Sequence, residues 1–164
     1  RHFGVSNQNP MMMELLKTAV KQPLKVNQLQ LSAAFTPSFE AGFHVNMEGP
    51  KAAVRDGSVF EYCRLTDTVI QAWSVLQHGF FKGNFVGKEE FAALNHVLND
   101  LAKKYQVTPT AIALAWVLRY PGKMQAVIGT TNPQHVLEAG KAATVTLTRK
   151  EWYQVYLAAG NDLP

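Results

Sequence analysis

The fold is decided by residues 126–140, which read AVIGTTNPQHVLEAG. Residues 126–128 form a short apolar run bounded by turn residues, and such a run is typical of a buried strand. Asn132 can cap a helix, and Pro133 suits the first helical position, where its missing N–H costs nothing. The helix is expected to end at Gly140. This stretch therefore predicts a strand that leads directly into a helix.

Gly129, Thr130 and Thr131 connect this strand to this helix. They provide one residue without a side chain, two hydroxyl groups, and backbone N–H groups at the N-terminus of a helix. Because unpaired N–H groups and the helix dipole both favour negative charge, such a turn can bind an anion. A plain strand-to-helix turn explains the same residues, so both interpretations stay open on this stretch alone.

The composition is that of a folded domain. Of the 164 residues, 47% are hydrophobic and 17% are charged, which is ordinary for a globular protein and argues against disorder. No apolar run approaches the roughly 18–20 residues of a membrane span, so we expect no membrane association and a cytoplasmic protein. Cys63 is the only cysteine, which excludes an internal disulfide and a cysteine metal site, and we assign no metal. The net charge of +4 comes from scattered Lys and Arg and does not favour nucleic acid.

Short apolar runs alternate with helical patterns along the chain. Strands are expected over residues 3–5, 24–29, 69–73 and 126–128. Helices are expected over residues 10–20, 59–66, 88–105, 109–118, 133–140 and 152–159. The helix-start signals are the cap-plus-proline pairs Asn9-Pro10 and Thr108-Pro109 and the capping boxes Ser58/Glu61 and Thr148/Glu151. Since no methionine precedes the first strand, which reads as already under way, we expect a piece of a longer chain.

Residues 30–57 show no clear periodicity and contain prolines and glycines. A stretch of this length without regular structure is uncommon in a compact domain, and is usually functional as a lid or binding loop. Its aromatic side chains can face a ligand or pack the loop down, and we favour packing for Phe35, Phe39, Phe43 and His44.

The alternation of strands and helices predicts parallel strands joined by right-handed crossovers, so the expected fold class is α/β. Polar or aromatic residues, with one glycine, lie at the end of every expected strand: Ser6, Asn7, Gln28, Trp73, Ser74, Gly129, Thr130 and Thr131. In an α/β barrel this end of the strands carries the active site. The alternative is a small open sheet with its ligand at a strand-order switch point, although no glycine-rich dinucleotide fingerprint supports it.

Five short motifs mark these strand ends and one helix: FGVSN at 3–7, VNQ at 26–28, QAWS at 71–74, ALAW at 113–116 and VIGTT at 127–131. With these motifs, the sequence resembles the C-terminal half of an aldo-keto reductase over essentially its whole length. Residues 41–44 and 55–58 resemble the bacterial oxidoreductases of that family. The resemblance implies a (β/α)8 TIM barrel that binds NADP(H). Residues 1–164 would supply its C-terminal half, four βα units, and the N-terminal half is absent from this chain.

The resemblance also implies roles for residues at the first two strand ends. Ser6, Asn7 and Gln28 take the positions that contact the nicotinamide carboxamide. Asn and Gln suit this role because an amide needs both donors and acceptors. The alternative, from the residues alone, is that Asn27 and Gln28 only satisfy neighbouring backbone groups.

At the third strand end, Trp73 takes the position where the family stacks an aromatic ring on the nicotinamide. Ser74 and the backbone after it would meet the pyrophosphate of the cofactor. Leu76, Gln77 and Gly79, in the following loop, would clamp that group.

At the fourth strand end, residues 129–131 correspond to the segment that receives the adenosine 2′-phosphate. Glu138 matches an acid that contacts the adenine. His135 stands where many members of the family have arginine. The resemblance implies NADP as the cofactor. Because a neutral imidazole offers less charge than a guanidinium, NAD is also possible.

No residue of this chain is assigned a catalytic role, because the family's catalytic Tyr, Lys, Asp and His lie on the first half of the barrel. Tyr62, Tyr105 and the five histidines occupy no matching positions. Hydride transfer to a carbonyl needs a positioned acid to protonate the developing alkoxide. We therefore expect the intact parent protein to be an NADP-dependent reductase of small aldehydes and ketones, and this chain to be inactive alone.

Two alternatives stay open. One is a non-catalytic module on the same fold that binds a nicotinamide cofactor. The other is a genuine half-barrel that pairs with another copy, because open parallel edges invite association. A half-barrel without the missing N-terminal half is expected to expose an apolar interior face of its strands.

Overall fold

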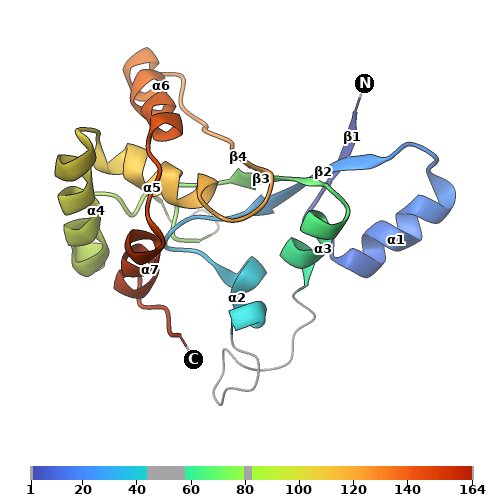
Figure 1. Cartoon of the computed structure of the whole chain (residues 1–164). Coiled ribbons are helices and arrows are strands. Elements are labelled where there is room, and N and C mark those ends of the chain that lie inside the picture. Colours follow the sequence, from blue (N-terminus) through green and yellow to red (C-terminus); the bar gives the residue numbers. More distant parts are fainter. Residues whose placement is uncertain (1, 44–57, 80–82, 164) are drawn as a thin grey trace.

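The computed structural model describes residues 2–43, 58–79 and 83–163 (Figure 1). The side chain of Phe43, His44 and residues 55–57, on which parts of the sequence interpretation rest, lie outside the described residues. None of the helices in the described part combines the length and apolar character that crossing a bilayer requires.

Four parallel strands form one sheet, in chain order. They are β1 (Phe3–Ser6), β2 (Leu24–Gln30), β3 (Val69–Trp73) and β4 (Met124–Ala126). The prediction of an α/β fold with parallel strands is therefore confirmed.

The fourth strand lies earlier in the sequence than expected, so the prediction of residues 126–128 was wrong in its bounds. Val127 still donates its N–H to the Ala72 carbonyl at 2.8 Å. On the neighbouring strand β3, the backbone turns away at Ser74, which has a φ of 52°. Residues after Val127 consequently leave the ladder, because no strand continues beside them.

Seven α-helices accompany the sheet in the described part of the chain. They are α1 (Pro10–Ala19), α2 (Pro37–Phe43), α3 (Val59–Leu65), α4 (Ala92–Tyr105), α5 (Pro109–Leu118), α6 (Pro133–Gly140) and α7 (Arg149–Ala158). Short 3-10 helices cover Glu89–Phe91 and Lys141–Thr144. The cap-plus-proline signals are confirmed, since Asn9, Thr108 and Asn132 each accept a hydrogen bond from a backbone N–H of the first turn.

The two capping boxes have different outcomes. Thr148 and Glu151 form theirs at the start of α7. The box expected at Ser58 is wrong, because Ser58 makes no side-chain capping hydrogen bond to α3. Its φ of −42° and ψ of 19° lie outside the extended conformation that aims a cap side chain at the first turn.

Two further predictions need correction. Helix α2 lies inside the stretch expected to be irregular, and its seven residues are too few to display a helical period in the sequence. The helix expected from Lys88 begins with a 3-10 turn, and α4 starts only at Ala92.

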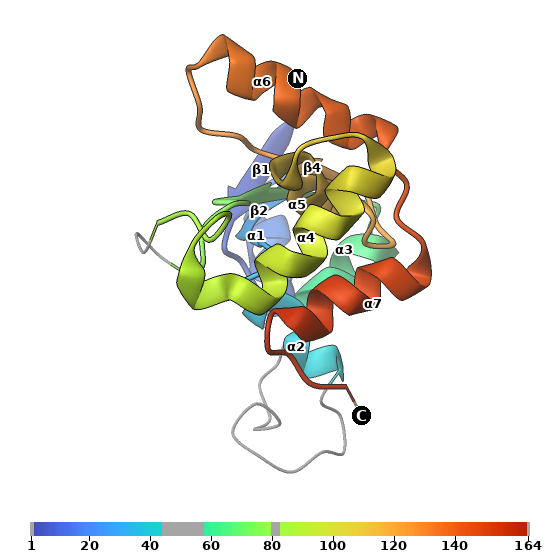
Figure 2. The ribbon, with the colours of Figure 1, turned by 90° about the vertical axis from the view of Figure 1, so that its left-hand side faces the viewer.

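The core lies between the sheet and the helices around α5. Residues Ala111 to Val117 of α5 are all buried, and Figure 2 shows α4 in front of this helix, with α7 packed against α4 below it. Trp116 stacks on Trp152 of α7 with ring centroids 4.8 Å apart. Phe39 of α2 packs edge-on against Phe60 at 5.4 Å, so the packing interpretation is confirmed for this aromatic residue.

The other face of the sheet carries a row of polar side chains. The strand register aligns Ser6, Gln28, Gln71 and Gln125 across all four strands. Gln71 Nε2 donates to Gln125 Oε1 at 2.9 Å, and Gln28 Nε2 lies 3.5 Å from Gln71 Oε1. The expectation of an apolar interior face is therefore wrong for this row, because amides rather than hydrocarbon occupy its centre.

Candidate functional site

The ends of β1 and β2 bring three of the predicted residues together. Ser6 Oγ donates to the Gln28 carbonyl at 3.2 Å, and the Asn7 backbone N–H donates to the same carbonyl at 2.9 Å. Asn7 has a φ of 54°, a left-handed conformation that asparagine tolerates better than most residues. Both Ser6 and Asn7 are exposed, so their polar side chains remain accessible at this corner.

Asn27 and Gln28 point to opposite faces of β2. Asn27 is fully buried, and its Nδ2 donates to the Gln8 carbonyl at 2.8 Å. The interpretation that this amide satisfies backbone groups is thus confirmed for Asn27. The Gln28 side chain instead joins the amide row beside Gln71, on the open face.

The loop after β3 is held in place by backbone groups. Gln77 N–H donates to the Ser74 carbonyl at 2.8 Å, and Ser32 Oγ donates to the Gln77 carbonyl at 2.5 Å. Phe85 N–H donates to the Leu76 carbonyl at 3.0 Å. Trp73 and Ser74 are half-buried and Gly79 is buried, and the hydrogen bonds above hold Ser74, Leu76 and Gln77 in place.

The N-terminus of α6 offers fewer open N–H groups than the sequence suggests. Pro133 has no N–H group. The Asn132 side chain accepts the N–H of Gln134 at 2.9 Å, and Thr130 Oγ1 accepts the N–H of Asn132 at 3.2 Å. In the described chain the N–H of His135 is the one left open in the first turn. An anion here would therefore depend on that N–H and on side chains.

Side chains beside this helix start can supply such contacts. Thr131 and His135 are exposed, and Gly129 is exposed beside them. His135 Nδ1 lies 3.5 Å from Thr130 Oγ1, so imidazole and hydroxyl share one edge of the turn. Glu138, one turn further along α6, accepts a hydrogen bond from Gln134 Nε2 at 3.1 Å.

Gln30 is a strand-end residue that the sequence interpretation missed. It is aligned with Trp73 across β2 and β3, and its Nε2 is buried without a hydrogen-bond partner in the described structure. An unpaired buried donor is costly, and an acceptor group of a ligand would satisfy it. The signal was available in the alternation of Gln28 and Gln30, which places both amides on one face of the strand.

Gln71 and Gln125 were also missed as neighbours of the candidate site. Their alignment depends on register, which short strands specify only after pairing. Once the strands are known to be parallel, the two glutamines extend the amide of Gln28 across the sheet.

The strongly perturbed carboxyl and thiol groups lie in the helical layer rather than at the strand ends. Burial raises the pKa of the Cys63 thiol to about 11, partly opposed by Asn27, which makes it a poor nucleophile. Burial alone would raise the pKa of Glu151, but hydrogen bonds from Lys104, Thr148 and Tyr105 lower it to about 2. Within the described ranges, no group of three or more His, Cys, Asp and Glu residues is placed to hold a metal ion.

Comparison with known proteins gives a consistent picture. The model of the aldo/keto reductase family matches residues 1–157. The chain is similar to a 6-dehydroglucose reductase of Agrobacterium fabrum, with 33% identity over 162 residues that are 98% of this chain and 47% of the relative. It is also similar to oxidoreductase YdhF of Escherichia coli, with 28% identity over 166 residues, 100% of this chain and 49% of the relative. The chain thus spans about half the length of these relatives.

Solved structures extend this likeness to the fold. The thermostable aldo-keto reductase Tm1743, in complex with the inhibitor epalrestat, superposes with a TM-score of 0.68 at 20% identity. The superposition covers 96% of this chain and 48% of that chain. Four parallel βα units arranged as one half of a (β/α)8 TIM barrel, as the sequence predicted, are therefore confirmed as the fold class.

Proposed function

Because the chain belongs to the aldo/keto reductase family, we propose that it supplies the cofactor-binding half of an NADP(H)-dependent oxidoreductase that reduces small aldehydes and ketones to alcohols. The family match over nearly the whole chain supports the oxidoreductase activity. The activity belongs to the whole protein, since this chain spans about half the length of its relatives.

The observation that carries the proposal is the set of open amide and hydroxyl groups at the ends of β1 and β2. Ser6 and Asn7 present exposed polar side chains beside Gln28, and the unpaired Nε2 of Gln30 lies on the same face of β2 as Gln28. These groups offer the donors and acceptors that a carboxamide needs. Ser6, Asn7 and Gln28 would hold the nicotinamide amide, with Gln30 donating to a carbonyl oxygen of the ligand. The bound cofactor would supply the hydride.

The loop after β3 and the start of α6 would hold the rest of the cofactor. Trp73 would stack on the nicotinamide ring, Ser74 would meet the pyrophosphate, and Leu76, Gln77 and Gly79 would clamp it. Gly129, Thr130 and Thr131 would surround the adenosine 2′-phosphate with His135, and Glu138 would face the adenine.

We place the proton donor of the reaction outside residues 1–164. Carbonyl reduction needs an acid that protonates the alkoxide as it forms. Two groups of the helical layer have strongly shifted pKa values, the buried thiol of Cys63 and the carboxylate of Glu151. Neither lies at the strand ends. We further propose a reducing, cytoplasmic environment, which the single, free cysteine of the chain, Cys63, fits.

The experiment that tests this function is a titration of the chain with NADPH, followed by fluorescence of the reduced nicotinamide. We expect saturable binding, weakened about tenfold or more by Trp73→Ala because base-like rings gain 1–3 kcal/mol from aromatic stacking. Leu157→Ala, an exposed change on α7, is the matched control and should leave the affinity unchanged. Equal affinities for Trp73→Ala and the parent chain would contradict the stacking role.

The same titration separates the two cofactors and the main alternative. His135→Arg adds a permanent charge and should favour NADPH over NADH, because guanidinium suits phosphate better than neutral imidazole. NADPH binding by the whole protein without reduction of any small aldehyde or ketone would favour the non-catalytic cofactor-binding module.

A further inference from the structure

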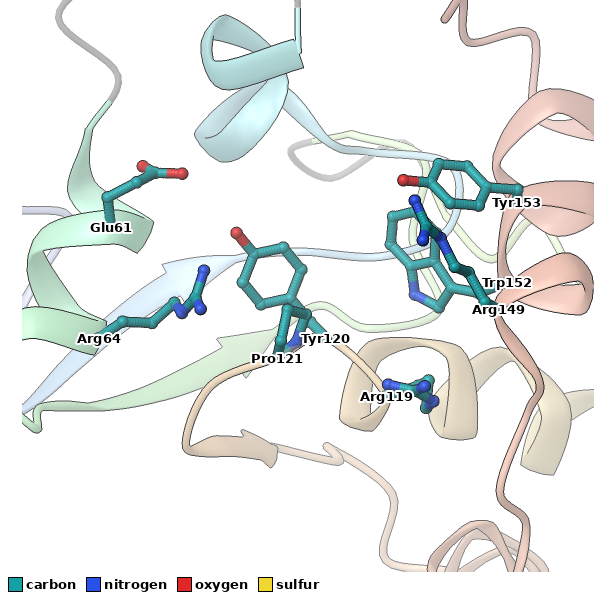
Figure 3. Close-up of a pocket in the computed structure, with 8 residues that line it drawn as sticks. All are labelled: Glu61, Arg64, Arg119, Tyr120, Pro121, Arg149, Trp152 and Tyr153. Atoms are coloured by element: carbon teal, nitrogen blue, oxygen red, sulfur yellow. The ribbon is translucent and has the colours of Figure 1, made fainter.

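A cavity of about 360 Å³ lies in the helical layer of the molecule (Figure 3). It lies among α3, the C-terminal end of α5 and α7, and α3 and α5 lead into the first residues of β3 and β4. The residues that line it are Glu61, Arg64, Arg119, Tyr120, Pro121, Arg149, Trp152 and Tyr153. None of them is among the residues assigned to the cofactor.

Three arginines reach this cavity from three different elements: Arg64 from α3, Arg119 from the end of α5, and Arg149 from α7. Each is held by a neutral group. Arg119 Nε donates to the Leu147 carbonyl at 2.9 Å, Arg64 interacts with the Tyr120 hydroxyl, and Arg149 lies 5.8 Å from the centre of the Tyr153 ring. Among the described residues, no carboxylate forms an ion pair with any of the three.

The described lining of the cavity therefore carries an excess of positive charge. Among the lining residues that the structure describes, three guanidinium groups oppose the single carboxylate of Glu61. Guanidinium groups bind phosphate and carboxylate through paired N–H donors in a fixed planar geometry. The three arginines are themselves exposed, and the hydrogen bond of Arg119 Nε to the Leu147 carbonyl reduces the entropy that this side chain would lose on binding an anion.

Aromatic rings form the remaining wall of the cavity. Tyr120 and Trp152 are only 8% and 7% exposed, so their rings are held rigidly by the core. Trp152 is fixed further by its stacking on Trp116 and by donating its indole N–H to the Trp116 carbonyl at 3.1 Å. Rigid rings beside cationic groups favour a ligand that is flat and apolar at one end and anionic at the other.

We propose that this cavity binds a small organic anion, a phosphate or carboxylate group carried on a flat apolar body. The anionic group contacts Arg149, the apolar body contacts Tyr120 and Trp152, and Arg64, on the other side of Tyr120, adds to the positive potential. The volume lies near the lower end of the range for small-molecule pockets, which suits a ligand with a single ring. This inference does not depend on the cofactor site, which is built from other residues.

Phenyl phosphate is the probe that tests the proposal, with benzoate as the carboxylate probe and benzyl alcohol as the uncharged one. Binding is followed by calorimetry and by the indole N–H signals of the three tryptophans in a nitrogen-edited NMR spectrum. We expect phenyl phosphate or benzoate to bind saturably and to shift the Trp152 signal, while the Trp73 signal stays in place. Benzyl alcohol should bind at least tenfold more weakly, because it lacks the charge that the arginines recognise.

Arg149→Gln is the main variant, and Lys150→Gln is its matched control because it removes the same charge from the neighbouring residue, which does not line the cavity. Arg149→Gln should weaken phenyl phosphate binding about tenfold, and Lys150→Gln should change it less than twofold. Arg64→Gln provides a second, independent variant, with the melting temperature of each protein as a check of folding. The absence of a saturable Trp152 shift with both anionic probes, or equal losses in Arg149→Gln and Lys150→Gln, would overturn the proposal.

Discussion

Helices α1 and α5 have the same length and the same start signal but opposite surroundings. Each has ten residues and begins with a side-chain cap followed by proline. Seven residues of α5 are buried, whereas only Pro10 and Met13 of α1 are, and Met11 and Leu15 are 68% and 72% exposed. The comparison shows that the local sequence sets where a helix begins, while its neighbours in the fold decide how much of it is buried.

The neighbours differ because α1 follows the edge strand β1, and α5 lies between α4, α6 and β4. Helices α1 and α6 follow the first and the last strand, and Figure 1 shows these two end helices on opposite sides of the molecule, α1 at the right and α6 at the upper left. Both end helices carry exposed apolar residues, among them Leu16 in α1 and Val136 and Leu137 in α6. We expect further barrel units, or a second copy of the chain, to cover these end helices, because exposed apolar clusters favour association.

The largest expected effect is the loss of core packing around α5. Trp116→Ala should lower the free energy of unfolding by about 3–5 kcal/mol, because it removes a fully buried ring that stacks on Trp152. Leu15→Ala, at an exposed position of α1, should change it by less than about 0.5 kcal/mol. Urea unfolding followed by circular dichroism measures both. A large loss in Leu15→Ala would mean that the outer face of α1 is already covered in solution.

The second effect is a loss of stability at acid pH through Glu151, which ties α7 to α4. Its folded-state pKa is about 2 against an ordinary value of 4.5, so its stabilising contribution is present above about pH 4.5 and is lost as the pH falls toward 2. Lys104, the partner of Glu151, is largely exposed. We therefore expect this contribution to the free energy of unfolding to be about 2 kcal/mol, which is less than the full pKa shift would give. Urea unfolding between pH 7 and pH 3 should show this dependence.

Glu151→Gln should flatten that pH dependence and lower the stability at neutral pH. Glu90→Gln, at an exposed position of the 3-10 helix Glu89–Phe91, is the control and should leave the dependence unchanged. If Glu151→Gln lost as much stability at acid pH as the parent chain does, the pH-sensitive group would lie elsewhere.

Much of this architecture could be predicted from the sequence, because its signals are local. The caps at Asn9, Thr108 and Asn132 each depend on a side chain two or three residues from the N–H that it binds. Strand β3 could be predicted at its observed bounds because apolar residues and turn signals enclose it. The parallel order of the strands follows from their alternation with helices.

What the sequence missed depends on residues far apart in the chain. The unpaired amide of Gln30 and the row through Gln71 become visible only when the strand register is known. The arginine cavity joins Arg64 and Arg149, which lie on different helices, and no spacing in the sequence relates them. The fourth strand was misplaced because its end is set by the turn at Ser74 on the neighbouring strand.

A smaller effect tests the two faces of β2. Asn27→Leu should cost about 1–3 kcal/mol, because it leaves the N–H and carbonyl of Gln8 without their buried partner. Gln28→Leu changes the neighbouring residue on the open face and should cost less, since its long contact to Gln71 lies near solvent. Thermal unfolding of the two variants measures the difference in their stability. Equal losses would mean that the amide row contributes as much to stability as the buried amide.

The smallest expected effect returns to the starts of α1 and α5. Thr108→Ala and Asn9→Ala should each cost about 1 kcal/mol, because each removes one hydrogen bond from a side-chain oxygen to a first-turn N–H. The two losses should be similar although the helices differ so much in burial, since the cap acts on the backbone of its own first turn. Urea unfolding of both variants measures this equality. A clearly larger loss for Thr108→Ala would mean that the start of α5 is coupled to the packing of Trp116, so that cap and core act as one unit there.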